Sequence, residues 1–131
     1  MPYFEPIPPH VERAAQDTIG AAIEVHRVLG PGFLERIYQE ALCIELRLRG
    51  MKFERERPVL VHYRGVEIPG QRIDLIVDTC LVVELKAASR FEAAAHHGQV
   101  ISYLRTTGLR LGLLLNFSCP TLRDGIRRIV L

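Results

Sequence analysis

Two acidic residues and a lysine are the side chains of this sequence best arranged for chemistry. They lie in residues 72–86, which read as two apolar strands joined by a tight turn. Because side chains alternate faces along a strand, Glu84 and Lys86 point the same way. If the turn is centred on Thr79, Asp74 pairs with Glu84, because both lie five residues from that centre. We therefore expect all three side chains on one face of the hairpin.

A pair of adjacent carboxylates predicts a cation site. Two carboxylates at such a short separation repel each other unless a cation lies between them. Their oxygen atoms suit Mg²⁺ or Mn²⁺. A metal bound beside a lysine would suit the hydrolysis of a phosphodiester. The competing interpretation is an ordinary ion pair on the protein surface. The apolar neighbours of the trio favour the functional interpretation, because charges on a hairpin buried on both faces are costly without a role.

The rest of the sequence predicts the elements that would position this hairpin. Helical spacing changes to a period of two after Gly50, and Pro69-Gly70 is expected to interrupt the strands. The helix after the Glu84 strand is long enough for a crossover, so this strand and the next should be parallel neighbours in a mixed sheet. Around the hairpin, the pattern predicts helices at 11–29, 33–49 and 91–107 and strands at 53–63, 66–68, 111–117 and 126–131.

The predicted third helix carries three polar side chains on one stripe. Gln99 and Tyr103 are four residues apart, and His96 lies three before Gln99. This helix starts soon after Lys86, so its first half must pass near the end of the Glu84 strand. A glutamine and a tyrosine there could hold the lysine or a substrate phosphate. Residues at the edge of a core would show the same spacing, and a lone histidine is more often a boundary residue than a metal ligand.

The predicted second helix carries Glu35 and Tyr38, one turn apart. An acid in the first turn of a helix is explained sufficiently by its interaction with the helix dipole. In the functional interpretation Glu35 is instead a third acid over the metal site.

Length and composition restrict the class of protein. The 131 residues fit one domain, which we expect at 10–131 after an extended arm at 1–9. Seventeen basic and fifteen acidic residues leave a net charge of +2, too little to indicate nucleic-acid binding by itself. Three widely spaced cysteines suggest reduced thiols rather than disulfides or a zinc site. The sequence contains no membrane-spanning run and no secretory signal, so we expect a cytoplasmic protein without membrane partners.

Several segments together resemble the GxxExxY group, small prokaryotic proteins within the PD-(D/E)XK nuclease superfamily. Gly32, Glu35 and Tyr38 match the pattern that names the group. The spacing of Gln99 and Tyr103 is similar to the last motif of RecB-like nucleases. The resemblance covers most of the chain, through matching segments at 25–35, 72–75, 83–86, 96–99, 102–105 and 112–117.

The resemblance implies a fold and a role for each site residue. The fold would be α/β, a PD-(D/E)XK restriction-endonuclease-like core of order αβββαβ with a mixed central sheet flanked by helices. Ile73 replaces the proline of the superfamily name, a position without chemistry. No cysteine set exists for the iron–sulfur cluster of some RecB-like enzymes, so we expect none. The implied metal ligands for Mg²⁺ or Mn²⁺ are Asp74, Glu84 and Glu35, the implied catalytic residues are Asp74, Glu84, Lys86 and Gln99, and the supporting residues are Glu35, Tyr103, His96 and Tyr38.

The implied function is a metal-dependent nuclease that hydrolyses phosphodiester bonds of nucleic acid, with DNA expected ahead of RNA. One alternative is a catalytically silent nucleic-acid-binding or assembly module on the same fold. Another is a protein in which the two acids and Lys86 form a buried ion network. The sequence does not separate internal from terminal cutting. Because two-fold dimers are the commonest homo-oligomers, we expect a homodimer.

Overall fold

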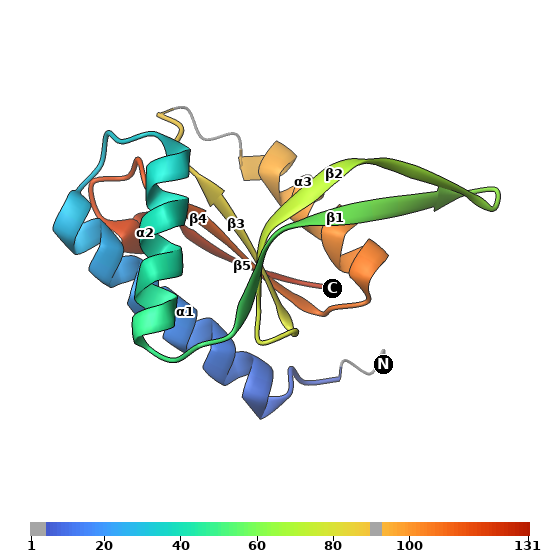
Figure 1. Cartoon of the computed structure of the whole chain (residues 1–131), viewed down its shortest axis with the longest axis horizontal. Coiled ribbons are helices and arrows are strands. Elements are labelled where there is room, and N and C mark those ends of the chain that lie inside the picture. Colours follow the sequence, from blue (N-terminus) through green and yellow to red (C-terminus); the bar gives the residue numbers. More distant parts are fainter. Residues whose placement is uncertain (1–4, 90–92) are drawn as a thin grey trace.

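The computed structural model describes residues 5–89 and 93–131, and its elements follow the predicted order (Figure 1). The helices are α1 (Pro9–Leu29), α2 (Glu35–Leu48) and α3 (Ala93–Thr107). The strands are β1 (Phe53–Tyr63), β2 (Val66–Val77), β3 (Leu81–Lys86), β4 (Leu111–Asn116) and β5 (Ile126–Val130), and a short 3-10 helix, η1 (Leu122–Gly125), precedes β5. Phe91, in the predicted third helix, lies outside the described residues.

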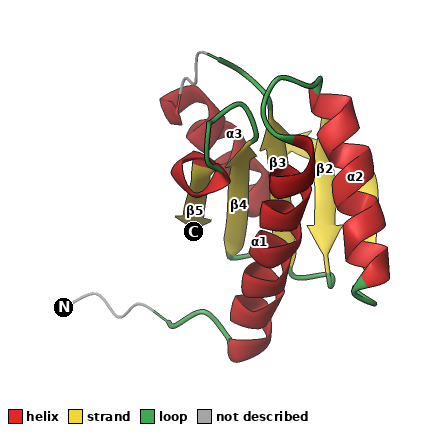
Figure 2. Ribbon diagram, turned by 90° about the vertical axis from the view of Figure 1, so that its left-hand side faces the viewer, coloured by secondary structure: helices red, strands yellow, loops and turns green. Residues whose placement is uncertain are grey.

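The five strands form one mixed sheet in the order β1-β2-β3-β4-β5. β3 and β4 run parallel, as predicted, and the other neighbouring pairs run antiparallel. α3 is the crossover between the two parallel strands. α1 and α2 cover one face of the sheet and α3 covers the other (Figure 2). The predicted α/β fold, a mixed central sheet flanked by helices, is confirmed.

Strand side chains alternate between two hydrophobic cores. Val83 and Leu85 of β3 pack toward α1 and α2, where Leu42 is fully buried. Val82 packs on the opposite face, against the core that includes Leu104 of α3. Burying one such side chain contributes about 2 kcal/mol, so the two cores fix the orientation of β3 firmly. The even-numbered residues of this strand therefore face α3.

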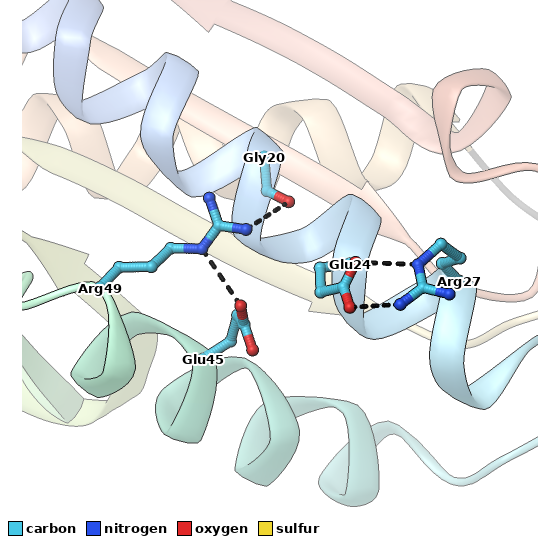
Figure 3. Close-up of polar contacts among 5 residues, drawn as sticks. All are labelled: Gly20, Glu24, Arg27, Glu45 and Arg49. Atoms are coloured by element: carbon cyan, nitrogen blue, oxygen red, sulfur yellow. Dashed lines mark hydrogen bonds and ion pairs between the residues drawn. The ribbon is translucent and has the colours of Figure 1, made fainter.

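Arg49, just after the end of α2, ties this helix to α1. Its Nη2 donates to the carbonyl oxygen of Gly20 at 3.4 Å, and its Nε donates to Glu45 at 3.2 Å (Figure 3). A Cβ at position 20 would lie 3.2 Å from the guanidinium, so glycine permits this close approach. The other pair in this region, Arg27 with Glu24, stays within α1. These contacts are partly exposed, so they orient the two helices more than they stabilise the fold.

The first residues of α1 and α2 each differ by two positions from the predicted ones. α1 begins at Pro9 because the first N–H groups of a helix lack a helical partner, so proline loses nothing there. α2 begins at Glu35 rather than at Phe33. Leu34 is extended, with φ −68° and ψ 148°, and the N–H of Phe33 donates to the Tyr38 hydroxyl at 3.2 Å. No helix in the described part of the chain is both long and apolar enough to span a bilayer.

β2 runs through Pro69-Gly70, where the sequence predicts an interruption. This part of β2 pairs with β1 alone, because β3 reaches only residues 75–77. The register with β1 shifts between Val59 and Val61, because Pro69 and Gly70 of β2 form a bulge opposite the single residue Leu60 of β1. A proline is tolerated there because one edge has no partner and the other is already irregular.

The hairpin between β2 and β3 has the predicted centre. Its pairs, Leu75 with Val83 through to Val77 with Leu81, are symmetric about Thr79. Asp78 and Thr79 have φ values of 50° and 59°, the left-handed conformation that a tight hairpin turn needs at its central residues.

Candidate active site

β2 and β3 separate at the point where the two acidic residues lie. The last pair of their ladder is Leu75 with Val83, and β2 continues beyond it with β1 alone. One residue further, the Oδ2 of Asp74 accepts a hydrogen bond from the N–H of Leu85 at 2.9 Å. The Asp74 carboxylate thus occupies the opening between the strands and satisfies a backbone group that the ladder no longer pairs.

The acids and the lysine lie on the face covered by α3. Ile76 of β2 and Val82 of β3 belong to the core beneath that helix. Asp74 is two residues from Ile76, and Glu84 and Lys86 are two and four residues from Val82. Strand alternation therefore gives all five side chains the same face. The structure brings Asp74 and Glu84 together as the hairpin register requires.

Glu84 is a buried acid with an unsatisfied oxygen. Its residue is 2% exposed, and among the described residues its Oε2 has no hydrogen-bond partner. Burial raises the pKa of this carboxyl to about 9. Hydrogen bonding with Asp74 and the charge of that carboxylate add to the rise, whereas Lys86 opposes it. Such a group is costly unless a proton or a cation neutralises it.

The donor set fits a divalent cation. A buried oxygen without a partner, next to a second carboxylate, is a position that a hard cation would satisfy. Within the described residues, no three His, Cys, Asp or Glu side chains gather closely enough to hold a metal alone. Two carboxylates with open positions for water and phosphate are nevertheless typical of Mg²⁺ sites, which seldom have an all-protein cage.

Glu35, the predicted third acid, lies at the first turn of α2. It is exposed, and the structure does not join it with Asp74 and Glu84 into one three-acid group. Partial burial and then the charge of Asp74 raise the pKa of its carboxyl, and Lys86 lowers it. Glu35 therefore stands close enough to the site to sense its charges without being a preformed ligand.

Lys86 is the last residue of β3 and is half-buried. Its carbonyl accepts a hydrogen bond from the N–H of Phe117 at 2.8 Å. The chain after it is held by Asn116, which is 1% exposed and exchanges two hydrogen bonds with the backbone of Ala88, at 3.2 and 3.3 Å. Ser118 also donates to the Ala88 carbonyl, at 2.5 Å. Sequence reasoning assigned Asn116 no role, although a buried amide that ends an apolar strand was a usable signal.

α3 contributes a tyrosine and a glutamine to the site. The Nε2 of Gln99 donates to the Tyr103 hydroxyl at 2.8 Å. Burial and then the charge of Glu84 raise the pKa of Tyr103 to about 12, so this hydroxyl stays protonated close to the buried acid. The side-chain amide of Gln99 thus contacts Tyr103, and its predicted role toward Lys86 or a substrate phosphate stays a prediction. His96, one turn before Gln99, is half-buried.

Tyr38 lies apart from the carboxylates. Its hydroxyl donates to the carbonyl of Gly30 at 2.5 Å and accepts from the N–H of Phe33. Its ring stacks on Phe117, with centroids 4.6 Å apart. Tyr38 therefore fastens the loop that leads into Glu35, and Gly32 supplies the left-handed turn in that loop, with φ 109°.

A family model described as the PD-(D/E)XK nuclease superfamily matches residues 12–129. The match runs from α1 into β5 and includes every residue of the candidate site. Comparison with curated proteins and with solved structures gives no match.

Proposed function

The chain belongs to the PD-(D/E)XK nuclease superfamily, and from this premise we propose that it is a divalent-metal-dependent nuclease of the GxxExxY group. Membership indicates a nuclease-like function with nucleic acid as substrate. The observation that carries the metal dependence is the buried, unsatisfied Oε2 of Glu84 beside the Asp74 carboxylate. Between DNA and RNA we propose DNA.

Asp74 and Glu84 are the proposed metal ligands. Nucleases of this superfamily generally use divalent metals such as Mg²⁺. A metal bound there would supply a Lewis acid that polarises the scissile phosphate and acidifies a water molecule. Asp74 also fixes its own orientation, because one oxygen already accepts the N–H of Leu85. Glu35, whose pKa responds to the charges of Asp74 and Lys86, is the proposed additional acid in the state with metal and substrate bound.

Lys86 is the proposed stabiliser of negative charge. The Asn116 clamp on Ala88 holds the chain just after it, so the ammonium group is presented from a fixed backbone. A cation placed in advance where charge develops on the phosphate lowers the barrier without reorganisation. Its point charge suits one phosphate oxygen, whereas an arginine would demand bidentate geometry.

Tyr103 and Gln99 are proposed positioning residues for Glu84. The protonated Tyr103 hydroxyl lies close to the buried carboxyl, and Gln99 fixes that hydroxyl by donating to it. A carboxylate with restricted rotation keeps its ligand oxygen in one place, which favours a productive metal geometry. His96 is a proposed supporting residue on the face of α3 that carries Gln99 and Tyr103. Tyr38 is the proposed supporting residue of the loop before α2.

The experiment is cleavage of labelled single-stranded DNA, duplex DNA and RNA with Mg²⁺ or Mn²⁺. We would compare the native chain with Glu84→Gln, which keeps the shape of the side chain, and with Asp78→Asn, which changes an exposed acid on the same hairpin. Metal-dependent cutting that Glu84→Gln loses and Asp78→Asn keeps is the expected result. Absence of cutting together with absence of metal binding by calorimetry would overturn the proposal and favour a silent binding module.

A further inference from the structure

A hollow of about 350 Å³ lies beside the end of α1, where η1 and the residues before it pack against this helix. Ile23, Pro120 and Leu122 give it a largely apolar lining, and the side chains of Arg27 and Arg123 line it as well. We call it the arginine hollow. Its volume and its apolar lining with a few polar groups are typical of sites that bind small ligands.

The arginine hollow lies at the same edge of the sheet as the proposed metal site. The end of α1 and the ends of the parallel strands β3 and β4 meet at this edge (Figure 2). Just after β4, Ser118 donates to the carbonyl of Ala88 at 2.5 Å, and the carbonyl of the next residue lies 2.9 Å from Nε2 of His26, which lines the hollow. This short wall therefore separates the hollow from the backbone that follows Lys86.

Arg27 presents a flat guanidinium group to the hollow. Its Nε and Nη2 donate to the two carboxylate oxygens of Glu24, at 2.9 and 2.6 Å (Figure 3). This two-point pairing holds the plane of the guanidinium and offsets its charge, so Arg27 has little attraction left for a phosphate. A guanidinium plane is a surface on which an unpaired base of nucleic acid stacks.

Arg123, on η1, supplies a positive charge without a partner. In the part of the chain that the structure describes, its side chain has neither a hydrogen bond nor an ion pair. The adjacent acid, Asp124, accepts a hydrogen bond from Thr121 at 2.9 Å instead. Because its donors are unused, Arg123 can contact a phosphate through two N–H groups at once.

We propose that the arginine hollow holds one unpaired nucleotide of the substrate strand, with its base on Arg27 and the apolar lining and its phosphate on Arg123. This inference rests on the proposed nuclease function, because the strand that enters the hollow is the strand cut at Asp74 and Glu84. A base within a duplex is stacked and paired, so it cannot enter. The substrate class is therefore DNA that is single-stranded beside the cut.

The lining of the hollow fits a nucleotide better than it fits simpler occupants. An inorganic anion would leave the apolar lining without a contact. An apolar side chain of another protein would leave the guanidinium of Arg123 without a partner. A nucleotide has a flat base and a phosphate, so it satisfies both parts of the hollow at once.

Binding of a labelled oligothymidylate, measured by fluorescence anisotropy in a chelator, tests the proposal without cleavage. The comparison strand has the same length and the same phosphates but abasic nucleotides. The native chain should bind the oligothymidylate roughly fivefold or more tightly than the abasic strand, because stacking of one base contributes at least that factor.

Two variants separate the base contact from the phosphate contact. Glu24→Gln with Arg27→Met removes the guanidinium plane at constant net charge, and it should abolish the preference for bases while keeping the salt dependence. Arg123→Gln should lower the slope of log affinity against log salt by about 0.7, the effect of one phosphate contact on a single strand. Arg13→Gln changes an exposed arginine near the start of α1, and this control should leave both quantities unchanged.

Equal affinity of the native chain for the two strands would overturn the proposal. So would salt slopes that fall equally in Arg123→Gln and Arg13→Gln, or free thymidine monophosphate that displaces the strand at the strand's own affinity. In the cleavage assay, a blunt duplex that is cut as fast as the single strand would also contradict it.

The two proposals can fail separately. A chain that cuts DNA but shows no preference for bases keeps the nuclease function and loses the nucleotide site. A chain that shows the preference but cuts nothing with Mg²⁺ or Mn²⁺ keeps the nucleotide site and loses the nuclease function.

Discussion

Glu84 holds a proton in the metal-free protein at neutral pH, because burial and then Asp74 raise the pKa of its carboxyl to about 9. A cation that binds this carboxyl must displace the proton. We therefore expect Mg²⁺ or Mn²⁺ binding to release a proton at neutral pH and to tighten about tenfold per pH unit below about 9. Calorimetry in two buffers of different ionisation enthalpy measures the release. Binding with no proton release, or unchanged binding in Glu84→Gln, would contradict this.

The same carboxyl predicts how metal-free stability depends on pH. Its pKa is higher in the folded chain than in the unfolded chain, so the unfolded chain gives up its proton first. The stabilisation that this bound proton gives the folded chain is complete below the ordinary pKa of a glutamate. It is lost as the pH rises toward about 9. Glu84→Gln has no such proton, so its melting temperature should fall less over this range.

Thermal unfolding of both proteins at several pH values, with a chelator present, measures this difference. The buried thiols of Cys43 and Cys80 titrate in both proteins and cancel in the comparison. Adding Mg²⁺ should reduce the fall in melting temperature with rising pH in the native chain and not in Glu84→Gln. Parallel pH profiles for the two proteins would show that Glu84 is not the buried acid described here.

At the scale of elements, Tyr38 connects a loop to a helix. Tyr38→Phe would leave the Gly30 carbonyl and the Phe33 N–H without their partner, at a cost of about 1–3 kcal/mol. Because this loop delivers Glu35, we also expect lower cleavage activity in the folded variant. Urea unfolding and initial rates measure the two effects. Tyr63→Phe, at the exposed end of β1, is the matched control and should change neither; equal effects in both variants would contradict the role of Tyr38.

Much of the element arrangement could be predicted from the sequence because its signals are local. The turn at Thr79 and the period of two around it predict the register that brings Asp74 to Glu84. The length of the third helix predicts that β3 and β4 are parallel. The path of β2 through Pro69-Gly70 could not be predicted, because it depends on which strand edges are paired.

The site itself is predictable only in part. Strand alternation alone predicts that Glu84 and Lys86 share a face. The roles of these residues, inferred from their chemistry and from the family resemblance, stay predictions. The clamp of Asn116 on Ala88 joins residues 28 positions apart, so no local pattern reveals it. The partner of Gln99 likewise depends on how close α3 packs to the sheet. Tertiary packing, rather than propensity, decides these contacts.

At the scale of the whole molecule, the two ends of β2 have different surroundings. β2 carries Asp74 where it parts from β3 and carries the exposed apolar residues Val66 and Ile68 at its other end. Six residues separate Asp74 from Ile68, about 20 Å of extended strand.

The rate of Mg²⁺-dependent DNA cleavage by Asp74→Asn, compared with the native chain and Asp78→Asn, tests the nuclease proposal most directly. Changing a metal ligand should cost at least the roughly 100-fold that changing its supporting partners can cost. We expect that loss in Asp74→Asn, no change in Asp78→Asn, and no cleavage by any of the three proteins in a chelator. Native-like cleavage by Asp74→Asn, or cleavage that persists without metal, would contradict a nuclease site at Asp74 and Glu84.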